Sequence, residues 1–428
     1  MKTRTVSAAR CIAGLLLAAL VLMPAAQGGS RPKMTTYETE HYTVKTDVSP
    51  QFARIVGAHM EEIHREYARR FRDYGEVKDR LDVVVFASVQ DYRDLVPREV
   101  RDSTGIFMVG RDTLAAHCEN RTTEEVLRTL YHEGFHQFMF EAVSRDCPIW
   151  LNEGLAEYFS EATWDGGGFA VGQVPTMRPY TVQQAIKTGS YLSLRSLFAL
   201  SADQWIQNAA MDARRASLLY CQAWSIAHFL IHAEGGRYAG MLDSFLRDLA
   251  HGKGQEEAFE RAFGSDIAAF ERTWVQYMMS LQPSDKFRCR ENMEALMLLA
   301  SMIYDRPQRL QSLSDLRQRL LRPGRRRWQI TRPTGEQITS DQQDAVEALF
   351  HCPYDRQQDR TSYVLIRDLT NGVPMLICNY HPGVIVKAYY RAKPDGKLEV
   401  VVEEQVRDTV DENMLRAIAE AEARGDRR

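Results

Sequence analysis

The chain has 428 residues, of which 44% are hydrophobic and 26% are charged. This composition is typical of globular proteins and excludes a largely disordered chain, and the length favours two domains. The formal net charge of -3 gives no overall basic field, so we do not expect nucleic-acid binding.

The first 28 residues have the pattern of a signal peptide. Lys2, Arg4 and Arg10 precede an uncharged apolar run at 11–23, and small residues follow it at 24–26. The run is shorter than the roughly 20 residues that span a bilayer. We therefore expect an exported protein, periplasmic or extracellular, with membrane contact only if this segment stays uncleaved as an anchor.

The region before residue 117 is predicted to form a small α/β layer. Alternation at 40–47 indicates a strand, apolar residues near 3.6 spacing at 50–72 indicate a helix, and the apolar run 81–86 indicates a buried strand. A helix is expected around 88–95. Glycines punctuate 104–116, which predicts a hairpin or an edge strand.

The middle of the chain is predicted to be mainly helical. Thr122 or Thr123 can cap a helix that carries Glu124 and Glu125 in its first turn, where the helix dipole favours carboxylates. A second helix follows Pro148. Further helices are expected at 181–188, 201–209, 214–234, 238–250, 255–262 and 266–281, and a loop is expected at 164–180.

A shift in composition near Pro283 predicts a second, small α+β domain over residues 290–428, with no motif that indicates its role. The whole chain is therefore expected to be α+β. The expected elements of the second domain are a helical stretch at 290–322, strands at 328–331, 362–368, 373–380, 384–391 and 397–405, and a final helix at 410–424.

Residues 131–137 (YHEGFHQ) place an H-E-x-x-H motif on a predicted helix. Residues four apart share a helix face, so His132 and His136 can point at one ion. Glu133 lies about a quarter-turn away, where its carboxylate can reach a water beside that ion. Neutral imidazoles suit Zn²⁺. The alternative is a helix with two solvated or core histidines.

A second motif, WLNEGLAEY at 150–158, supplies a carboxylate 17 residues after His136. Glu153 completes a set of two histidines and one glutamate, which leaves one position of a zinc ion open for water or substrate. Glu157 lies one turn later. It can accept a hydrogen bond from His132 or His136 and fix its tautomer, or it is a surface glutamate.

Together, HEGFH and WLNEGLAEY resemble the gluzincin zinc peptidases, specifically the peptidase MA-like group. The similarity covers residues 36–283, which we predict to be one domain. It implies a thermolysin-type α+β catalytic domain that binds one zinc ion. The resemblance implies zinc ligation by His132, His136 and Glu153, with Glu133 as the general base for hydrolysis of a peptide or protein substrate.

The same resemblance gives Tyr220 the position of the aminopeptidase tyrosine, which acts as a second electrophile; helix packing is the alternative. It also makes the 104–116 hairpin an edge strand along which a peptide lies. The aminopeptidase signature G-x-M-E-N is absent, which favours an endopeptidase. His228 and His232 also lie four residues apart, but no carboxylate is placed like Glu133, so we expect core or surface histidines.

Two other functions stay open at this level. The first is a catalytically inactive, gluzincin-like binding or scaffold protein of the cell envelope. The second is a surface-assembly protein in which the C-terminal domain is the working part. The deletion of residues 290–428 would separate this last function from peptide hydrolysis.

Six cysteines follow the leader. In an oxidising compartment, Cys118 with Cys147 and Cys352 with Cys378 are possible disulfide pairs, which the sequence does not establish. The chain contains no C-x-x-C motif, so the sequence gives no support for a zinc site made of cysteines.

Overall fold

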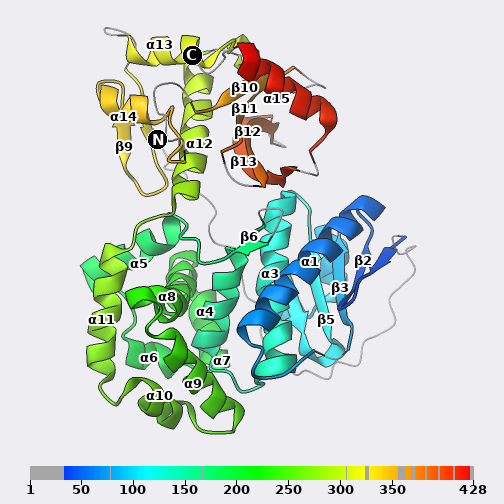
Figure 1. The fold of residues 1–428 in the computed structure, drawn as a ribbon, viewed down its shortest axis with the longest axis vertical. Helices are drawn as coiled ribbons and strands as arrows, with labels where there is room; N and C mark the ends of the chain where they lie inside the picture. Colours follow the sequence, from blue (N-terminus) through cyan, green and yellow to red (C-terminus); the bar gives the residue numbers. More distant parts are fainter. Residues whose placement is uncertain are drawn as a thin grey trace. The chain divides into compact units, whose positions relative to one another are not determined.

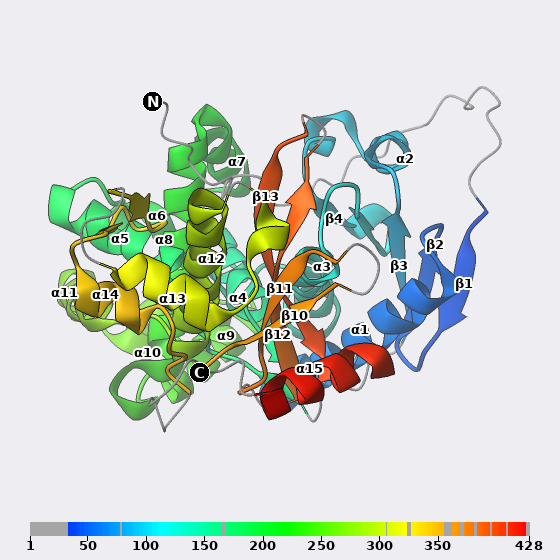
Figure 2. The same ribbon diagram turned by 90° about the horizontal axis from the view of Figure 1, so that it is seen from above.

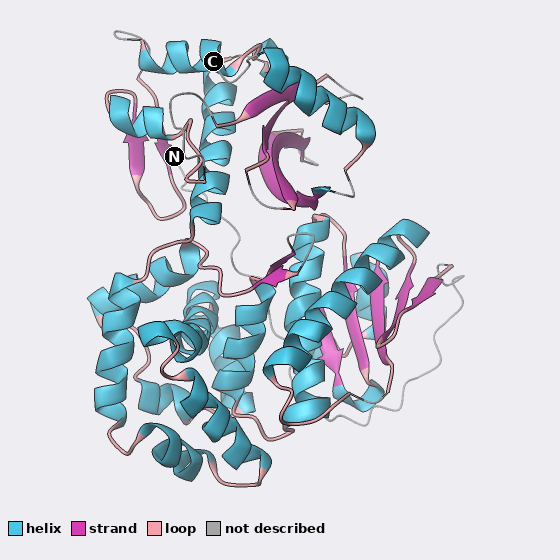
Figure 3. Ribbon diagram, in the orientation of Figure 1, coloured by secondary structure: helices cyan, strands magenta, loops and turns pink. Residues whose placement is uncertain are grey.

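The computed structural model describes residues 33–77, 79–164, 168–304, 306–322, 327–354, 362–368, 372–380, 383–393, 396–407 and 410–424. Helices and strands are mixed, as expected for an α+β protein (Figure 3). They form two compact units, the first running to Leu281 and the second from Gln282, with short segments of 164–177 divided between them. The predicted leader lies outside the described residues. Within those residues, no helix combines the length and apolar character needed to cross a bilayer.

The first unit contains a five-stranded sheet in the order β1-β2-β3-β5-β4 (Figure 1). β2, β3 and β5 run parallel, whereas β1 and β4 pair antiparallel at the two edges. The predicted hairpin at 104–116 is therefore confirmed, and β4 is its edge strand. The strands are β1 (Thr35–Glu38), β2 (Tyr42–Thr46), β3 (Leu81–Phe86), β4 (Gly105–Met108) and β5 (Thr113–His117).

Helices cover both faces of this sheet. α1 (Pro50–Arg70) and α3 (Thr123–Phe138) pack against one face and against each other, and α2 (Val89–Leu95) packs against the opposite face (Figure 2). Successive residues of a strand point to opposite faces of the sheet. Ala115 of β5 points to the face covered by α2, where it clusters with Tyr92, so its neighbours in β5 point to the face covered by α1 and α3. The continuous apolar character of the central strands follows from burial on both sides.

α4 (Ile149–Ser160) and α8 (Ala213–His232) pack closely along each other. At Gly154, a β-carbon would lie 2.5 Å from the carbonyl oxygen of Ala223. Glycine therefore allows the two helix backbones to approach this closely. Further helices complete the unit: α5 (Met177–Thr188), α6 (Leu194–Phe198), α7 (Ala202–Met211), α9 (Ala239–Ala250), α10 (Gln255–Phe263) and α11 (Ile267–Ser280).

The second unit contains a four-stranded antiparallel sheet between two helices. α12 (Asp285–Ile303) packs on the face that carries Leu376 and Val386, and α15 (Glu412–Arg424) packs on the face that carries Ile377 and Ile385. The strands, in spatial order, are β10 (Val364–Arg367), β11 (Pro374–Cys378), β12 (Val384–Ala392) and β13 (Leu398–Val406). Smaller elements are α13 (Leu313–Leu321), β8 (Gln329–Thr331), β9 (Gln337–Thr339) and α14 (Gln343–Ala348).

The helical stretch predicted at 290–322 is largely confirmed but is divided into two helices. α12 ends at Ile303 and α13 begins only at Leu313. Pro307 lies between them in a short 3₁₀ turn. Because proline lacks an amide hydrogen and clashes with the preceding helical turn, it is disfavoured in a helix interior.

The loop predicted at 164–180 is partly wrong. The two-residue strands β6 (Thr163–Trp164) and β7 (Phe169–Ala170) pair there, and α5 already begins at Met177. Pro179 lies in the first turn of α5, where a missing amide hydrogen costs no helical hydrogen bond. This proline is therefore compatible with the first turn of a helix and does not indicate a loop.

Candidate active site

α3 and α4 carry most of the side chains of the candidate site. A capping box fixes the start of α3: the Thr122 hydroxyl accepts from the Glu125 amide, and the Glu125 carboxylate accepts from the Thr122 amide. This satisfies two of the amide groups left unpaired at a helix start. The defined start sets the rotation of the helix, so that His132 and His136 project from one buried face.

The structure brings together His132, His136 and Glu153. The Nε2 atoms of the two histidines lie 3.1 Å apart. Glu153 Oε2 lies 3.4 Å from His132 Nε2 and 3.7 Å from His136 Nε2. All three side chains are buried, and each offers one ligand atom within 4.8 Å of the others.

The chemistry of this group fits a zinc ion. Glu153 Oε2 is buried and accepts no hydrogen bond from the described residues, although an unsatisfied buried acceptor costs about 1–3 kcal/mol. A cation facing this oxygen removes that cost. Two nitrogens bound to one tetrahedral zinc ion, each at about 2.0–2.1 Å, lie about 3.3 Å apart. The two Nε2 atoms lie close to that separation.

Acceptors from α4 face the other ring nitrogens. His136 Nδ1 lies 3.1 Å from Asn152 Oδ1, and His132 Nδ1 lies 3.6 Å from Glu157 Oε1. An acceptor beside Nδ1 favours the tautomer that carries its proton there, which leaves the Nε2 lone pair available for a metal. Glu157 therefore lies where the predicted orienting role requires it, beside His132 rather than His136.

Arg178 of α5 binds the Glu157 carboxylate through the oxygen that does not face His132. Its guanidinium pairs with Glu157 Oε2, and its Nε donates to Glu161 Oε1 at 2.7 Å. Burial opposes this positive charge, but Glu157 and Glu161 outweigh it and raise the pKa of Arg178. Sequence reasoning missed Arg178, because it lies in a stretch predicted as a loop and no spacing relates it to either motif.

Glu133 lies between α3 and the edge strand β4. Its Oε2 accepts a hydrogen bond from the Phe107 amide at 3.0 Å, so this amide points away from β5. Gly105 permits the close approach of β4 to α3, since a β-carbon there would overlap the methyl group of Thr129. Burial raises the pKa of Glu133, with partial opposition from the two histidines.

The charges of the site are coupled. Burial disfavours the His132 imidazolium, but the carboxylates of Glu153, Glu157 and Glu133 outweigh it and raise the pKa of His132 to about 9. Burial also disfavours the Glu153 carboxylate, but His136 and His132 outweigh it and lower the pKa of Glu153 to about 2. A buried space that stabilises positive charge this strongly also favours a metal cation.

Tyr220 lies on α8, the helix packed along α4, and its ring meets that of Trp205 edge-on. Burial raises the pKa of the neighbouring Cys221 thiol, and the charges of Arg178 and Glu157 also act on it. This turn of α8 is therefore close to the groups that support the site. The catalytic role of Tyr220 stays a prediction.

His228 is buried and His232 is exposed, and each lies within hydrogen-bonding distance of a neighbouring group. His228 Nδ1 lies 2.7 Å from the Tyr277 hydroxyl, and its Nε2 lies 3.2 Å from the Gly172 carbonyl oxygen. His232 Nε2 lies 2.9 Å from the Tyr158 hydroxyl. Burial lowers the pKa of His228 to about 4, which keeps it neutral. For both residues, a core or a surface histidine stays the expectation.

Two histidines and a glutamate, buried on packed helices with a further glutamate beside an edge strand, define a metallopeptidase-like site. Residues 104–280 match the family model of the Peptidase MA superfamily. The match includes β4, α3, α4 and α8, and it leaves residues 281–428 uncovered. The chain matches no curated protein.

Proposed function

We propose that this protein is a zinc-dependent peptidase that cleaves internal bonds of a peptide or protein substrate. The observation that carries the proposal is the Glu153 oxygen, which is buried without a hydrogen bond from the described residues and faces two histidine nitrogens. The match to the Peptidase MA superfamily supports it. The leader-like residues 1–28 support action outside the cytoplasm.

His132, His136 and Glu153 would hold the zinc ion. When bound, zinc supplies a Lewis acid for the scissile carbonyl group and lowers the pKa of water. With zinc bound, Asn152 would accept from His136 Nδ1, and Glu157, 3.6 Å from His132 Nδ1, would favour the same tautomer of His132. Arg178 keeps the Glu157 carboxylate in place.

Glu133 would act as the general base. It takes a proton from the attacking water and gives it to the leaving nitrogen. The raised pKa of Glu133, which follows from its burial, brings it nearer to the neutral range in which a group can both accept and return a proton. The hydrogen bond from the Phe107 amide fixes the direction of its carboxylate.

The substrate would lie along β4. This strand pairs with β5 on one side. On its other edge the Phe107 amide already donates to Glu133, so an extended peptide would replace that hydrogen bond or use the remaining backbone groups of this edge. Such binding depends little on side chains. The absence of the G-x-M-E-N signature removes the acidic anchor for a free amino terminus and supports cleavage within a chain.

A peptide-library cleavage assay combined with zinc analysis tests this function. Glu133→Gln should lower turnover by about 10²–10⁴-fold and keep the zinc content of the wild type, because the substitution preserves shape and removes the base. Glu141→Gln, an exposed glutamate beyond the same helix, should retain turnover. Equal turnover in Glu133→Gln would refute the general base. Zinc binding without any cleavage by the wild type would instead support the scaffold function.

A further inference from the structure

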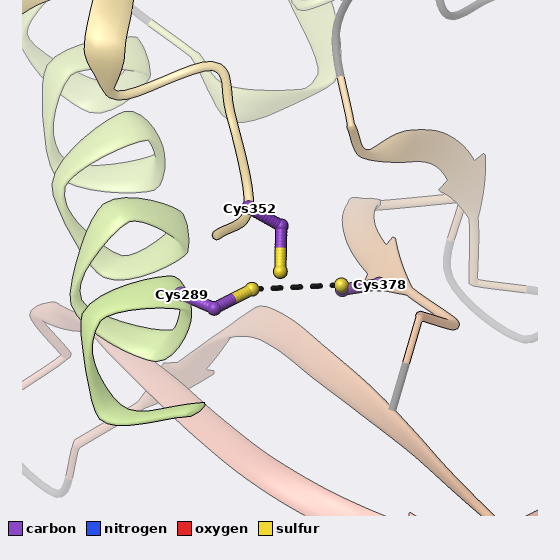
Figure 4. Close-up of side chains that lie close together, drawn as sticks. All are labelled: Cys289, Cys352 and Cys378. Carbon is purple, nitrogen blue, oxygen red and sulfur yellow. Dashed lines mark hydrogen bonds between the residues drawn. The ribbon is translucent and has the colours of Figure 1, made fainter. Parts of the chain in front are cut away.

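Three cysteine side chains meet in the core of the second unit (Figure 4). Cys289 comes from α12, Cys352 from the segment after α14, and Cys378 from the end of β11. Each is 0% exposed, and their sulfur atoms lie within 4.8 Å of one another. The Sγ atoms of Cys289 and Cys378 are 3.5 Å apart. We call these residues the cysteine cluster.

The disulfides considered from the sequence are not present, because none of the described cysteines is in a disulfide. A disulfide requires sulfur atoms about 2.05 Å apart, well below the separation of Cys289 and Cys378. The sequence offered Cys352 with Cys378 as a possible pair and gave no role to Cys289. Cys118 donates instead to the Phe86 carbonyl oxygen at 3.4 Å, and the possible pair of Cys118 with Cys147 is absent as well.

The surroundings of the cysteine cluster are apolar. It belongs to a buried core that includes Met293, Leu296, Phe350 and Leu376. The Tyr363 hydroxyl approaches Cys289 Sγ at 3.8 Å. No histidine, aspartate or glutamate of the described ranges joins this ligand group. Its donor atoms are therefore soft sulfur atoms alone, in contrast to the nitrogen and oxygen donors of the first unit.

The convergence of three sulfurs favours a metal ion over other arrangements. Thiols are weak hydrogen-bond donors and acceptors, so three of them gain little from facing one another. A disulfide would use two sulfurs and leave the third unused. Thiolates on a tetrahedral ion with a Zn–S distance of about 2.3 Å lie about 3.8 Å apart. The Sγ atoms of Cys289 and Cys378 lie near that separation.

We propose that Cys289, Cys352 and Cys378 form a structural site for one soft metal ion, Cu⁺ or Zn²⁺. Thiolate donors select these ions. Binding replaces three S–H bonds by three metal–sulfur bonds and releases three protons to solvent. Because a thiol must lose its proton to bind the ion, uptake of the ion depends on pH. The ion would tie α12, β11 and the segment after α14 together.

The test titrates the reduced, metal-free full chain with Cu⁺ and, separately, with Co²⁺ as a spectroscopic substitute for Zn²⁺. The readout is the ultraviolet thiolate-to-metal charge-transfer band, which the histidine and glutamate ligands of the first unit do not produce. The variant Cys289→Ser/Cys352→Ser/Cys378→Ser should lose this band. The matched variant Cys118→Ser/Cys147→Ser/Cys221→Ser removes as many thiols outside the cluster and should keep it.

A second measurement uses the wild type alone, in case the triple variant does not fold. Both proteins are alkylated under partly unfolding conditions. The three cluster thiols should be protected in the metal-loaded protein and should react in the metal-free protein. If the band and the protection appear only with Cu⁺, the ion is Cu⁺. If they appear only with Co²⁺ and Zn²⁺, the ion is Zn²⁺. Absence of both the band and the protection would overturn the proposal. So would a disulfide between two of the three cysteines in protein purified without reductant.

Discussion

The two ligand groups of this protein are built in different ways. His132, His136 and Glu153 lie on neighbouring helices, and polar groups from α4 support the outer nitrogens of both histidines. The cysteine cluster of the second unit lies in an apolar core, drawn from three separate elements. Imidazoles need partners to set their tautomer, whereas thiols are stable in an apolar core and would lose their protons only to a bound ion.

The largest expected effect comes from Glu153→Ala, which tests whether the two groups act independently. Loss of a ligand should weaken zinc binding in the first unit by more than the roughly 10–100-fold that loss of an orienting residue costs. The cysteine cluster should keep its thiolate band, because it shares no residue with that site. Competition with a chromophoric chelator measures the first effect. Zinc retention equal to that of wild type under this challenge would exclude Glu153 as a ligand.

The second unit should respond to acid through Glu404. Its Oε1 lies 2.7 Å from Lys286 Nζ and 2.8 Å from an Arg290 guanidinium nitrogen, which joins β13 to α12. Burial disfavours the Glu404 carboxylate, but Lys286 and Arg290 outweigh it and lower its pKa to about 2. A folded pKa below the unfolded value of 4.5 stabilises the fold above pH 4.5.

That stability should disappear as the pH falls from 4.5 towards 2. Hydrogen-exchange protection factors of α12 and β13 amides measure it. In Glu404→Gln the uncharged amide cannot titrate, so this part of the acid sensitivity should be absent. Equal loss of protection in the variant and the wild type would assign the acid response to other groups.

The group of His132, His136 and Glu153 could be predicted because its members lie close together in the sequence. The spacing of His132 and His136 needs a helix and nothing else, and Glu153 follows on the next helix. A capping threonine at 122 or 123 and the bounds of most central helices, though not the start of α5, could be predicted for the same reason. Arg178 could not, since it reaches Glu157 only through the packing of α5, which no periodicity in the sequence encodes.

The cysteine cluster could not be predicted for a related reason. Cys289 and Cys378 meet because α12 packs on one face of the sheet and Cys378 points to that face. A one-residue change of strand register would turn Cys378 to the other face. Sequence rules for cysteine sites depend on short spacings such as C-x-x-C, and these residues are separated by whole elements. Their proximity is a property of the tertiary fold.

The smallest expected effect tests the orienting groups themselves. Asn152→Leu keeps the approximate volume of the side chain but removes the acceptor for His136 Nδ1, so zinc affinity should fall by about 10–100-fold. Asn152→Asp retains an acceptor and should recover most of the lost zinc affinity.

Tyr363→Phe removes the hydroxyl near Cys289, but at 3.8 Å this contact is weak, so metal binding by the cysteine cluster should change little. Chelator competition at each site gives both affinities. If Tyr363→Phe weakened its site as much as Asn152→Leu weakened the other, the cysteine cluster would also depend on a polar partner, and the contrast between the two groups would fail.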